Sequence, residues 1–245
     1  MNLVNAIVLF LPLYFLSMIA AVIAAARLIR RSNANKSPTN TAHSRWIHYS
    51  FIALFLFFLL NLVAESTAWI RVSMLLPTYN TYTFNYLLNV PAILLFFAIH
   101  VRNRFYNLLI VTAYGGFVYV FIEHKLWLAL APIPFVFGIV LFSSLVVAST
   151  IFLASSLISH SRQPNQFKIH LGLVFLLYNF LALFIAVFML DHKVEGLDPL
   201  ILFYINGILA LLYYTGCAIV MFRYSKKLVG GTNFYIPKQT KEIVE

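Results

Sequence analysis

Residues 49–70 read YSFIALFLFFLLNLVAESTAWI, an almost unbroken apolar run that holds one amide, Asn61, and one carboxylate, Glu65. The hydrocarbon core of a bilayer is about 30 Å thick, and a helix crosses it with roughly 20 apolar residues. Inside lipid only helices and closed barrels satisfy the backbone hydrogen bonds, and this run lacks the alternation of a barrel strand. The stretch therefore predicts a membrane-spanning helix that carries a polar pair near one end.

The composition of the whole chain agrees with that prediction. The 245 residues are 62% hydrophobic and 10% charged, with a mean hydropathy of +0.89. Soluble domains usually contain about 25% charged residues, so a soluble globular protein is excluded. The single cysteine, Cys217, rules out an internal disulfide, and no Cys/His spacing typical of a metal site occurs. We expect no metal and no cofactor.

Apolar runs of similar length recur along the chain and predict an all-α integral membrane protein. We expect one transmembrane domain over 1–228, a seven-helix bundle, followed by a short cytoplasmic tail at 229–245. The predicted spans are 4–26, 49–70, 83–101, 105–122, 131–158, 170–190 and 199–222. The polar link at 27–48 is predicted to be a flexible loop.

The distribution of basic residues predicts the orientation of the bundle. If the N-terminus lies outside, all but Arg71, Lys125 and Lys193 of the 17 Lys and Arg residues fall on the inner side. Such a bias over short loops is the positive-inside pattern, and it places the C-terminus in the cytoplasm. The formal net charge of +10 therefore indicates topology and not nucleic acid as a partner. The same basic belt is suited to attract anionic lipid of the bilayer.

Polar residues at one depth predict a binding site. With a rise of 1.5 Å per residue, Glu65 lies about 24 Å along its span, in the outer third of the bilayer. Asn61 is one helical turn away on the same face. An ionised carboxylate at such a depth must pair, protonate or meet water. Four further polar side chains are expected at similar depth, so we predict an outward-facing, ligand-binding polar pocket lined by Glu65, Asn61, Asn85, Asn89, Tyr204 and Asn206.

A structural role for the same residues remains open. Glu65 can pair with Arg71 and only fix the packing of helices, and Asn and Tyr commonly form hydrogen bonds between membrane helices. A catalytic role has less support, because no Gly-x-Ser-x-Gly motif and no Gly-rich phosphate loop occur. We name no catalytic residue.

Seven spans with an outside N-terminus is the arrangement of rhodopsins and G-protein-coupled receptors. The last span, PLILFYINGILALLYYTGCAIVMF, however has neither a lysine for retinal nor an Asn-Pro-x-x-Tyr pattern. In topology, length and a polar residue in the second span, the chain resembles seven-helix membrane-sensor modules of bacterial signalling proteins. The resemblance implies a multi-pass protein of a bacterial plasma (inner) membrane that acts through a membrane-protein partner or as a homo-oligomer.

Four functions are compatible with these observations, of which a scaffold subunit of a larger complex is the least specific. The first is a sensor, receptor-type or accessory subunit with the pocket around Glu65. The second is a small-solute transporter or channel subunit, which needs a path through the membrane as well as a pocket. The third, a lipid-modifying enzyme, ranks last because a lone carboxylate has no visible nucleophile, metal or base beside it.

Overall fold

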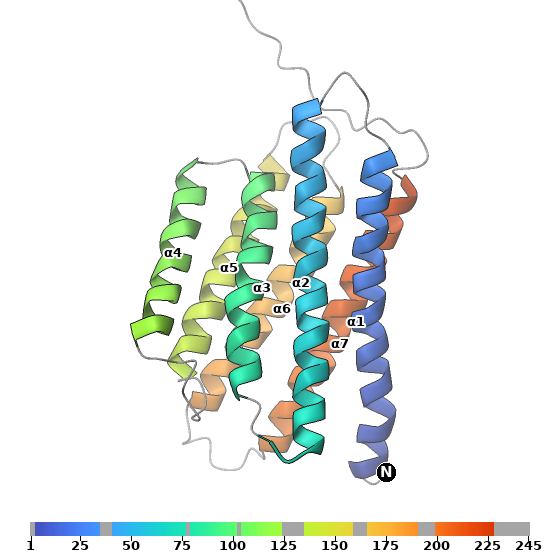
Figure 1. Ribbon diagram of the computed structural model, residues 1–245, viewed down its shortest axis with the longest axis vertical. Coiled ribbons are helices and arrows are strands. Elements are labelled where there is room, and N and C mark those ends of the chain that lie inside the picture. The colour runs from blue at the N-terminus through green and yellow to red at the C-terminus, as the bar shows by residue number, and fades with distance from the viewer. Residues whose placement is uncertain are drawn as a thin grey trace, which may run out of the picture.

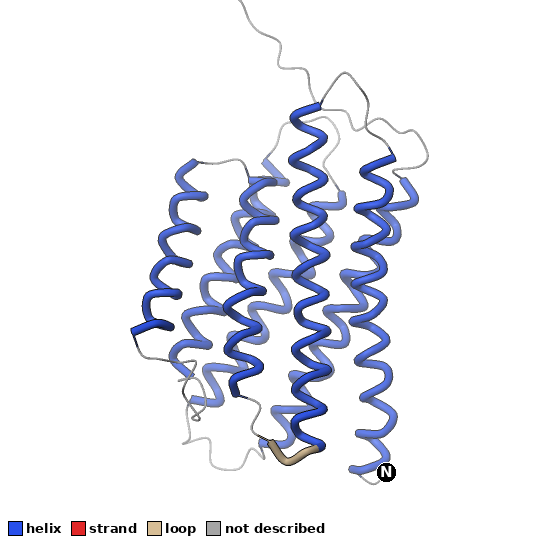
Figure 2. Tube along the Cα trace, viewed as in Figure 1, coloured by secondary structure: helices blue, strands red, loops and turns tan. Residues whose placement is uncertain are grey.

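The computed structural model describes residues 3–34, 41–76, 79–101, 104–123, 135–158, 166–190 and 199–227. In these residues the regular structure is entirely α-helical, with one short turn after the second helix (Figure 1, Figure 2). The helices are α1 (Leu3–Ala34), α2 (Thr41–Ser73), α3 (Tyr79–Val101), α4 (Arg104–Glu123), α5 (Phe135–Ile158), α6 (Gln166–Leu190) and α7 (Pro199–Lys227).

The helices are longer than the predicted spans at several ends. α1 continues to Ala34 and α2 begins at Thr41, so the prediction of a flexible loop over 27–48 was wrong for most of that link. A helix that is already nucleated extends readily into polar sequence, because each added residue gains a hydrogen bond without a new nucleus. Residues 35–40, 131–134 and the tail at 229–245 lie outside the described residues.

Four of the described helices contain stretches that are long and apolar enough to cross a membrane, in α1, α2, α6 and α7. The described apolar stretches of α3 and α5 are shorter, Leu87–Val101 and Phe142–Leu157. One face of α6 exposes Leu173, Leu177, Phe180 and Phe184, which are 48–62% exposed and lie three or four residues apart. A continuous apolar stripe of this kind suits contact with lipid and not with water.

Six of the helices form a closed ring in the order α1, α2, α3, α5, α6, α7 and back to α1, and α4 lies outside it against α3 (Figure 1). Each helix is antiparallel to the helix that precedes it in the sequence (Figure 1). Within the ring, α3 is therefore parallel to its neighbour α5, and α7 is parallel to α1. These two parallel contacts, the α3–α5 seam and the α7–α1 seam, divide the ring into an N-terminal triplet (α1–α3) and a C-terminal triplet (α5–α7).

Helix α4 connects the two triplets and lies across the α3–α5 seam. Two parallel neighbours cannot be joined by a short turn, so the chain needs a return segment, and α4 is that segment. The hydroxyl of Tyr114 donates to the carbonyl oxygen of Leu87 in α3 at 2.8 Å. The hydroxyl of Tyr106 donates to the carbonyl oxygen of Ala148 in α5 at 3.3 Å. The two tyrosines thus attach α4 to both sides of the seam.

Aromatic side chains fill the centre of the helix ring in the half farther from the N-terminal end of α1. Phe97 of α3 packs against Phe152 of α5 at 5.0 Å between ring centroids and against Phe175 of α6 at 5.4 Å. We call this group the aromatic plug; its members are at most 1% exposed and are Phe58, Phe96, Phe97, Phe152 and Phe175. Because protein interiors are packed without large voids, the plug closes the ring at mid-height.

Small residues bring α1 close to its neighbours. Ala21, Ala24 and Ala25 are at most 1% exposed, whereas Ala26 on the same helix is exposed. The buried alanines follow the helical spacing that places them on one face. Small side chains on such a face allow close contact between membrane helices, where dispersion and not the hydrophobic effect favours association.

Candidate functional site

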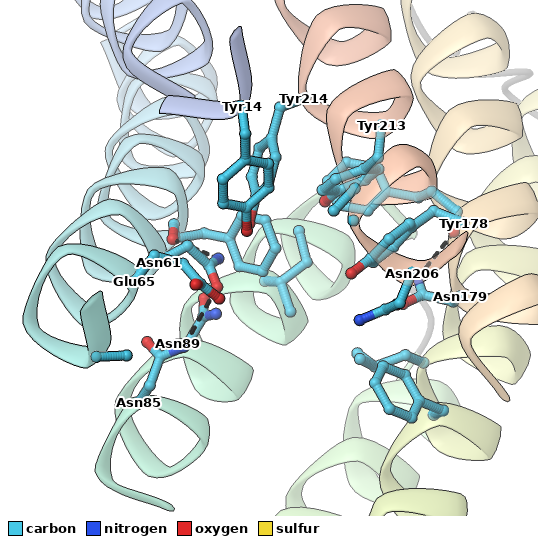
Figure 3. A pocket seen from close by; sticks show the side chains of 18 of the residues that line it. Tyr14, Asn61, Glu65, Asn85, Asn89, Tyr178, Asn179, Asn206, Tyr213 and Tyr214 are labelled. Atoms are coloured by element: carbon cyan, nitrogen blue, oxygen red, sulfur yellow. Dashed lines mark hydrogen bonds between the residues drawn. The ribbon is translucent and has the colours of Figure 1, made fainter. Parts of the chain in front are cut away.

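The half of the ring in which α1 begins encloses a cavity of about 600 Å³ (Figure 3). All six ring helices contribute to its wall, and the described residues of α4 do not. We call the end of the ring at which α1, α3, α5 and α7 begin the cavity end. The polar residues of the lining are Tyr14, Asn61, Glu65, Asn85, Asn89, Tyr178, Asn179, Tyr204, Asn206, Tyr213 and Tyr214.

All six residues that the sequence nominated line this one cavity. Asn61 and Glu65 come from α2, Asn85 and Asn89 from α3, and Tyr204 and Asn206 from α7. Arg71 does not line it. The residues of the predicted pocket are therefore brought together, and the binding of a ligand among them stays a prediction.

Several residues of the lining were missed by the sequence reasoning. They are Tyr14 in α1, Tyr178 and Asn179 in α6, and Tyr213 and Tyr214 in α7. A tyrosine in an apolar run is compatible with many roles, so these four carry no distinct signal. Asn179 is a lone amide in the apolar sequence of α6, which is the same signal that identified Asn61, and it could have been found in that way.

A short chain of hydrogen bonds fixes the orientation of the amides on the α2–α3 wall. The Nδ2 of Asn61 donates to the carbonyl oxygen of Phe57 at 2.9 Å. A carbonyl only accepts, so Asn61 must turn its Oδ1 the other way. The Nδ2 of Asn85 donates to that Oδ1 at 3.3 Å, which leaves the Oδ1 of Asn85 as the acceptor at the end of the chain.

Two amide oxygens on this wall have no hydrogen-bond partner among the described residues. They are the Oδ1 atoms of Asn85 and Asn89, whose side chains are 9% and 6% exposed. A buried acceptor left without a donor costs about 1–3 kcal/mol. Asn85 and Asn89 are one helical turn apart on α3 and both line the cavity, but the two oxygens themselves are covered, so a ligand reaches them only when the amide groups turn toward it.

The carboxylate of Glu65 lies on the same wall, one turn after Asn61. In Figure 3 the rings of Tyr14 from α1 and Tyr214 from α7 enter the cavity beside this wall, with their hydroxyl ends toward the part of the cavity that holds Asn61 and Glu65. Tyr214 is within electrostatic range of the Glu65 carboxylate. Glu65 is partly buried, so the carboxylate belongs to the cavity and not to the lipid-facing surface.

The α6–α7 wall is aromatic. Tyr178 and Tyr213 stack with 4.2 Å between their ring centroids and an interplanar angle of 21°. Asn179 beside them is held by its Nδ2, which donates to the carbonyl oxygen of Phe175 at 2.9 Å and to the hydroxyl of Ser149 at 3.4 Å. These contacts fix the wall before any ligand is present.

The floor of the cavity is the start of the aromatic plug. Phe175 lines the cavity and belongs to the plug, and Phe57 packs against it at 5.9 Å between centroids. Val72, which is 52% exposed, and Asn206, which is also exposed, are lining residues that lie toward the cavity end. The cavity is therefore a cup with a closed floor at mid-height and accessible residues near the cavity end.

The charge of the cup is set by one residue. Among the described lining residues Glu65 is the only carboxylic acid, and none is Lys, Arg or His. A negative centre surrounded by amides, phenols and phenyl rings favours cationic or hydrogen-bond-donating molecules over anions.

Comparison of the chain with protein-family models, with curated proteins and with solved structures finds no match. The function is therefore argued from the geometry of the cup.

The hydrogen bond between Asn61 and Asn85 is expected to contribute measurably to the packing of α2 against α3. In a double-mutant cycle of Asn61→Ala and Asn85→Ala, the coupling free energy of unfolding in mild detergent should be about 0.6 kcal/mol, the average for such bonds in membrane proteins. The matched cycle of Asn61→Ala with Asn179→Ala, across the cavity, should be additive. Equal coupling in both cycles would contradict a direct bond.

Proposed function

We propose that the chain is a seven-span membrane protein of sensor or receptor type that binds a small molecule in the cup around Glu65. The carrying observation is that polar residues from both triplets line one cavity above a packed aromatic floor. A cup that is closed at mid-height can hold a molecule but provides no path for it through the membrane. Binding can shift the packing of the two triplets, and a partner protein at the inner face receives that shift.

The proposed orientation places the cup toward the outside. Among the described basic residues, only Arg71 lies at the cavity end of the ring. The others are at the far end: Arg27, Arg30, Arg31, Arg45, Arg104, Lys168, Arg223, Lys226 and Lys227. By the positive-inside rule the far end is cytoplasmic, which supports an outside N-terminus and α3, α4 and α5 as further spans. The plasma membrane is the compartment that fits this orientation.

A transporter is the second candidate, and the arrangement of the helices favours it. The N-terminal and C-terminal triplets run in the same direction, are joined by α4 and enclose the cavity between them. Transporters built of parallel repeats, related by an axis along the membrane normal, hold their substrate between the repeats. In that case the aromatic plug is the closed inner gate of an outward-open state.

An enzymatic role gains no support from the cup. Its described lining contains no Ser, Thr, Cys, His or Lys, the side chains that most often serve as nucleophile or base beside a carboxylate.

Binding and flux measured together separate the two candidates. Small molecules are screened against the purified protein by their effect on its thermal unfolding, and hits are tested for uptake into proteoliposomes. Ala68, which lines the cavity and is 2% exposed, is changed to Phe to fill the cup, and Ala26→Phe, on an exposed position of α1, is the control.

The expected result is that wild type and Ala26→Phe bind a hit without uptake, and that Ala68→Phe does not bind it. If wild type takes up the hit and Ala68→Phe does not, the transporter proposal is supported and the sensor proposal is overturned. Hits that bind all three proteins equally would contradict a binding function for the cup.

A further inference from the structure

We propose that the molecule bound in the cup is a small organic cation, an ammonium group with N–H donors on an apolar body. The proposal rests on the proposed function only in that the cup is a binding site; it adds the chemical class of the ligand. Three independent features of the lining carry it: its charge, its unsatisfied acceptors and its aromatic faces.

The charge of the lining excludes anions and favours cations. Glu65 is the one charged side chain among the described lining residues. Electrostatic interactions strengthen away from bulk water, so the carboxylate disfavours an anion in the cup, whose described lining holds no Lys, Arg or His. The Glu65 carboxylate has about four lone-pair positions, so it can accept from an ammonium group as well as from the protein.

The amide oxygens of α3 specify donors and not merely positive charge. The hydrogen-bond chain from Phe57 through Asn61 to Asn85 leaves the Asn85 Oδ1 without a donor. The Asn89 Oδ1, one turn further along α3, is in the same state. An –NH₃⁺ group carries three donors, so one such group near Glu65 can also donate to one of these oxygens once its amide group turns into the cavity. A quaternary ammonium has the charge without the donors.

The aromatic wall offers the other half of the site. Tyr178 and Tyr213 form a stacked pair opposite the α2–α3 wall, and Tyr14, Trp69 and Tyr214 add further rings. A cation within about 6 Å of such faces is attracted by the ring quadrupole. Phenyl rings at the floor suit an apolar body.

The size of the cup argues for an organic molecule. Cavities of roughly 300–1,000 Å³ enclose drug-sized ligands, and this one measures about 600 Å³. A bare Na⁺ would leave most of that volume and all of the aromatic surface unused.

The test compares probes of one shape that differ in charge and in donors. Binding to the full-length protein in a neutral maltoside detergent is measured by titration calorimetry with 2-phenylethylammonium, its N,N,N-trimethyl analogue, 2-phenylethanol, 3-phenylpropionate and NaCl. We expect 2-phenylethylammonium to bind best, 2-phenylethanol to bind roughly 10- to 100-fold more weakly because it lacks the charge-assisted hydrogen bonds, and 3-phenylpropionate not to bind. The trimethyl analogue should lie between the first two.

Two variants separate charge from hydrogen bonding. Glu65→Gln is expected to lower the affinity for 2-phenylethylammonium roughly 10-fold or more and to leave 2-phenylethanol unchanged. Asn89→Leu replaces the amide with an apolar side chain of similar volume and so removes an acceptor. It should lower the affinity for the primary ammonium several-fold without changing the affinity for the trimethyl analogue. Thermal unfolding of each variant confirms that it is folded.

The outcomes distinguish the ligand class from the binding function. If the neutral or anionic probe bound best, and Ala68→Phe abolished its binding, the ligand would not be a cation but the cup would still be a binding site. Na⁺ binding that competes with every probe would make the site inorganic and would also overturn the organic cation. Absence of binding by all probes would overturn the organic cation, and the screen with Ala68→Phe would then decide on the binding function by itself. If wild type and Glu65→Gln bound 2-phenylethylammonium with equal affinity, Glu65 would not contribute to ligand binding, and the charge argument would be wrong.

Discussion

Phe152→Ala is expected to lower the free energy of unfolding by about 3–5 kcal/mol, the range for truncating a buried Phe. Phe152 is fully buried and joins the two triplets across the α3–α5 seam. Its ring lies 5.0 Å from Phe97 and 5.6 Å from Phe96 of α3, between centroids. On its other side it meets α6 at Gly172, where an added Cβ would lie 3.1 Å from the ring.

The measurement is reversible unfolding in mild detergent, with Phe180→Ala as the matched control. Phe180 is 54% exposed on the lipid-facing stripe of α6, and its truncation should change stability by less than about 1 kcal/mol. Similar losses for the two variants would mean that the aromatic plug is not the packed centre of the ring.

Ala24→Leu is expected to destabilise the ring by about 1–3 kcal/mol, because three added carbon atoms must enter a fully packed face. Ala24 is completely buried on the face of α1 that also carries Ala21 and Ala25. A leucine there holds α1 away from its neighbours, and the effect should appear as a lower midpoint of thermal unfolding.

Ala26→Leu provides the control on the same helix. Ala26 is exposed, so the same added side chain meets the surroundings of the bundle and costs little. If Ala24→Leu proved as stable as Ala26→Leu, the close approach of α1 would not be a packing requirement.

The helices and the six nominated pocket residues could be predicted because both depend on distance along the chain. The length of an apolar run gives a helix that fits the bilayer, and the rise per residue gives the depth of Glu65. Asn85, Asn89 and Tyr204 were assigned to the same depth by that arithmetic, and all of them line the cavity. The number of membrane crossings and the orientation remain predictions.

The order of the helices around the ring could not be predicted in the same way. Hydropathy does not specify which helices touch, and the position of α4 outside the ring depends on side-chain contacts such as those of Tyr106 and Tyr114. Four tyrosines of the cup, Tyr14, Tyr178, Tyr213 and Tyr214, were missed for the same reason, since only the packing directs them inward. The polar link at 27–48 was misjudged because helices extend beyond the apolar runs that nucleate them.

The α7–α1 seam has a consequence for the biogenesis of the protein. Tyr14 packs edge-on against Tyr214 at 6.1 Å between centroids, and the guanidinium of Arg27 lies 5.9 Å from the Phe222 ring centre. These partners are separated by almost the whole chain, so during translation α1 enters the bilayer long before α7 leaves the ribosome. The face of α1 that will meet α7 must therefore tolerate lipid, or the insertion machinery, until α7 arrives. The ring closes only when α7 is in place.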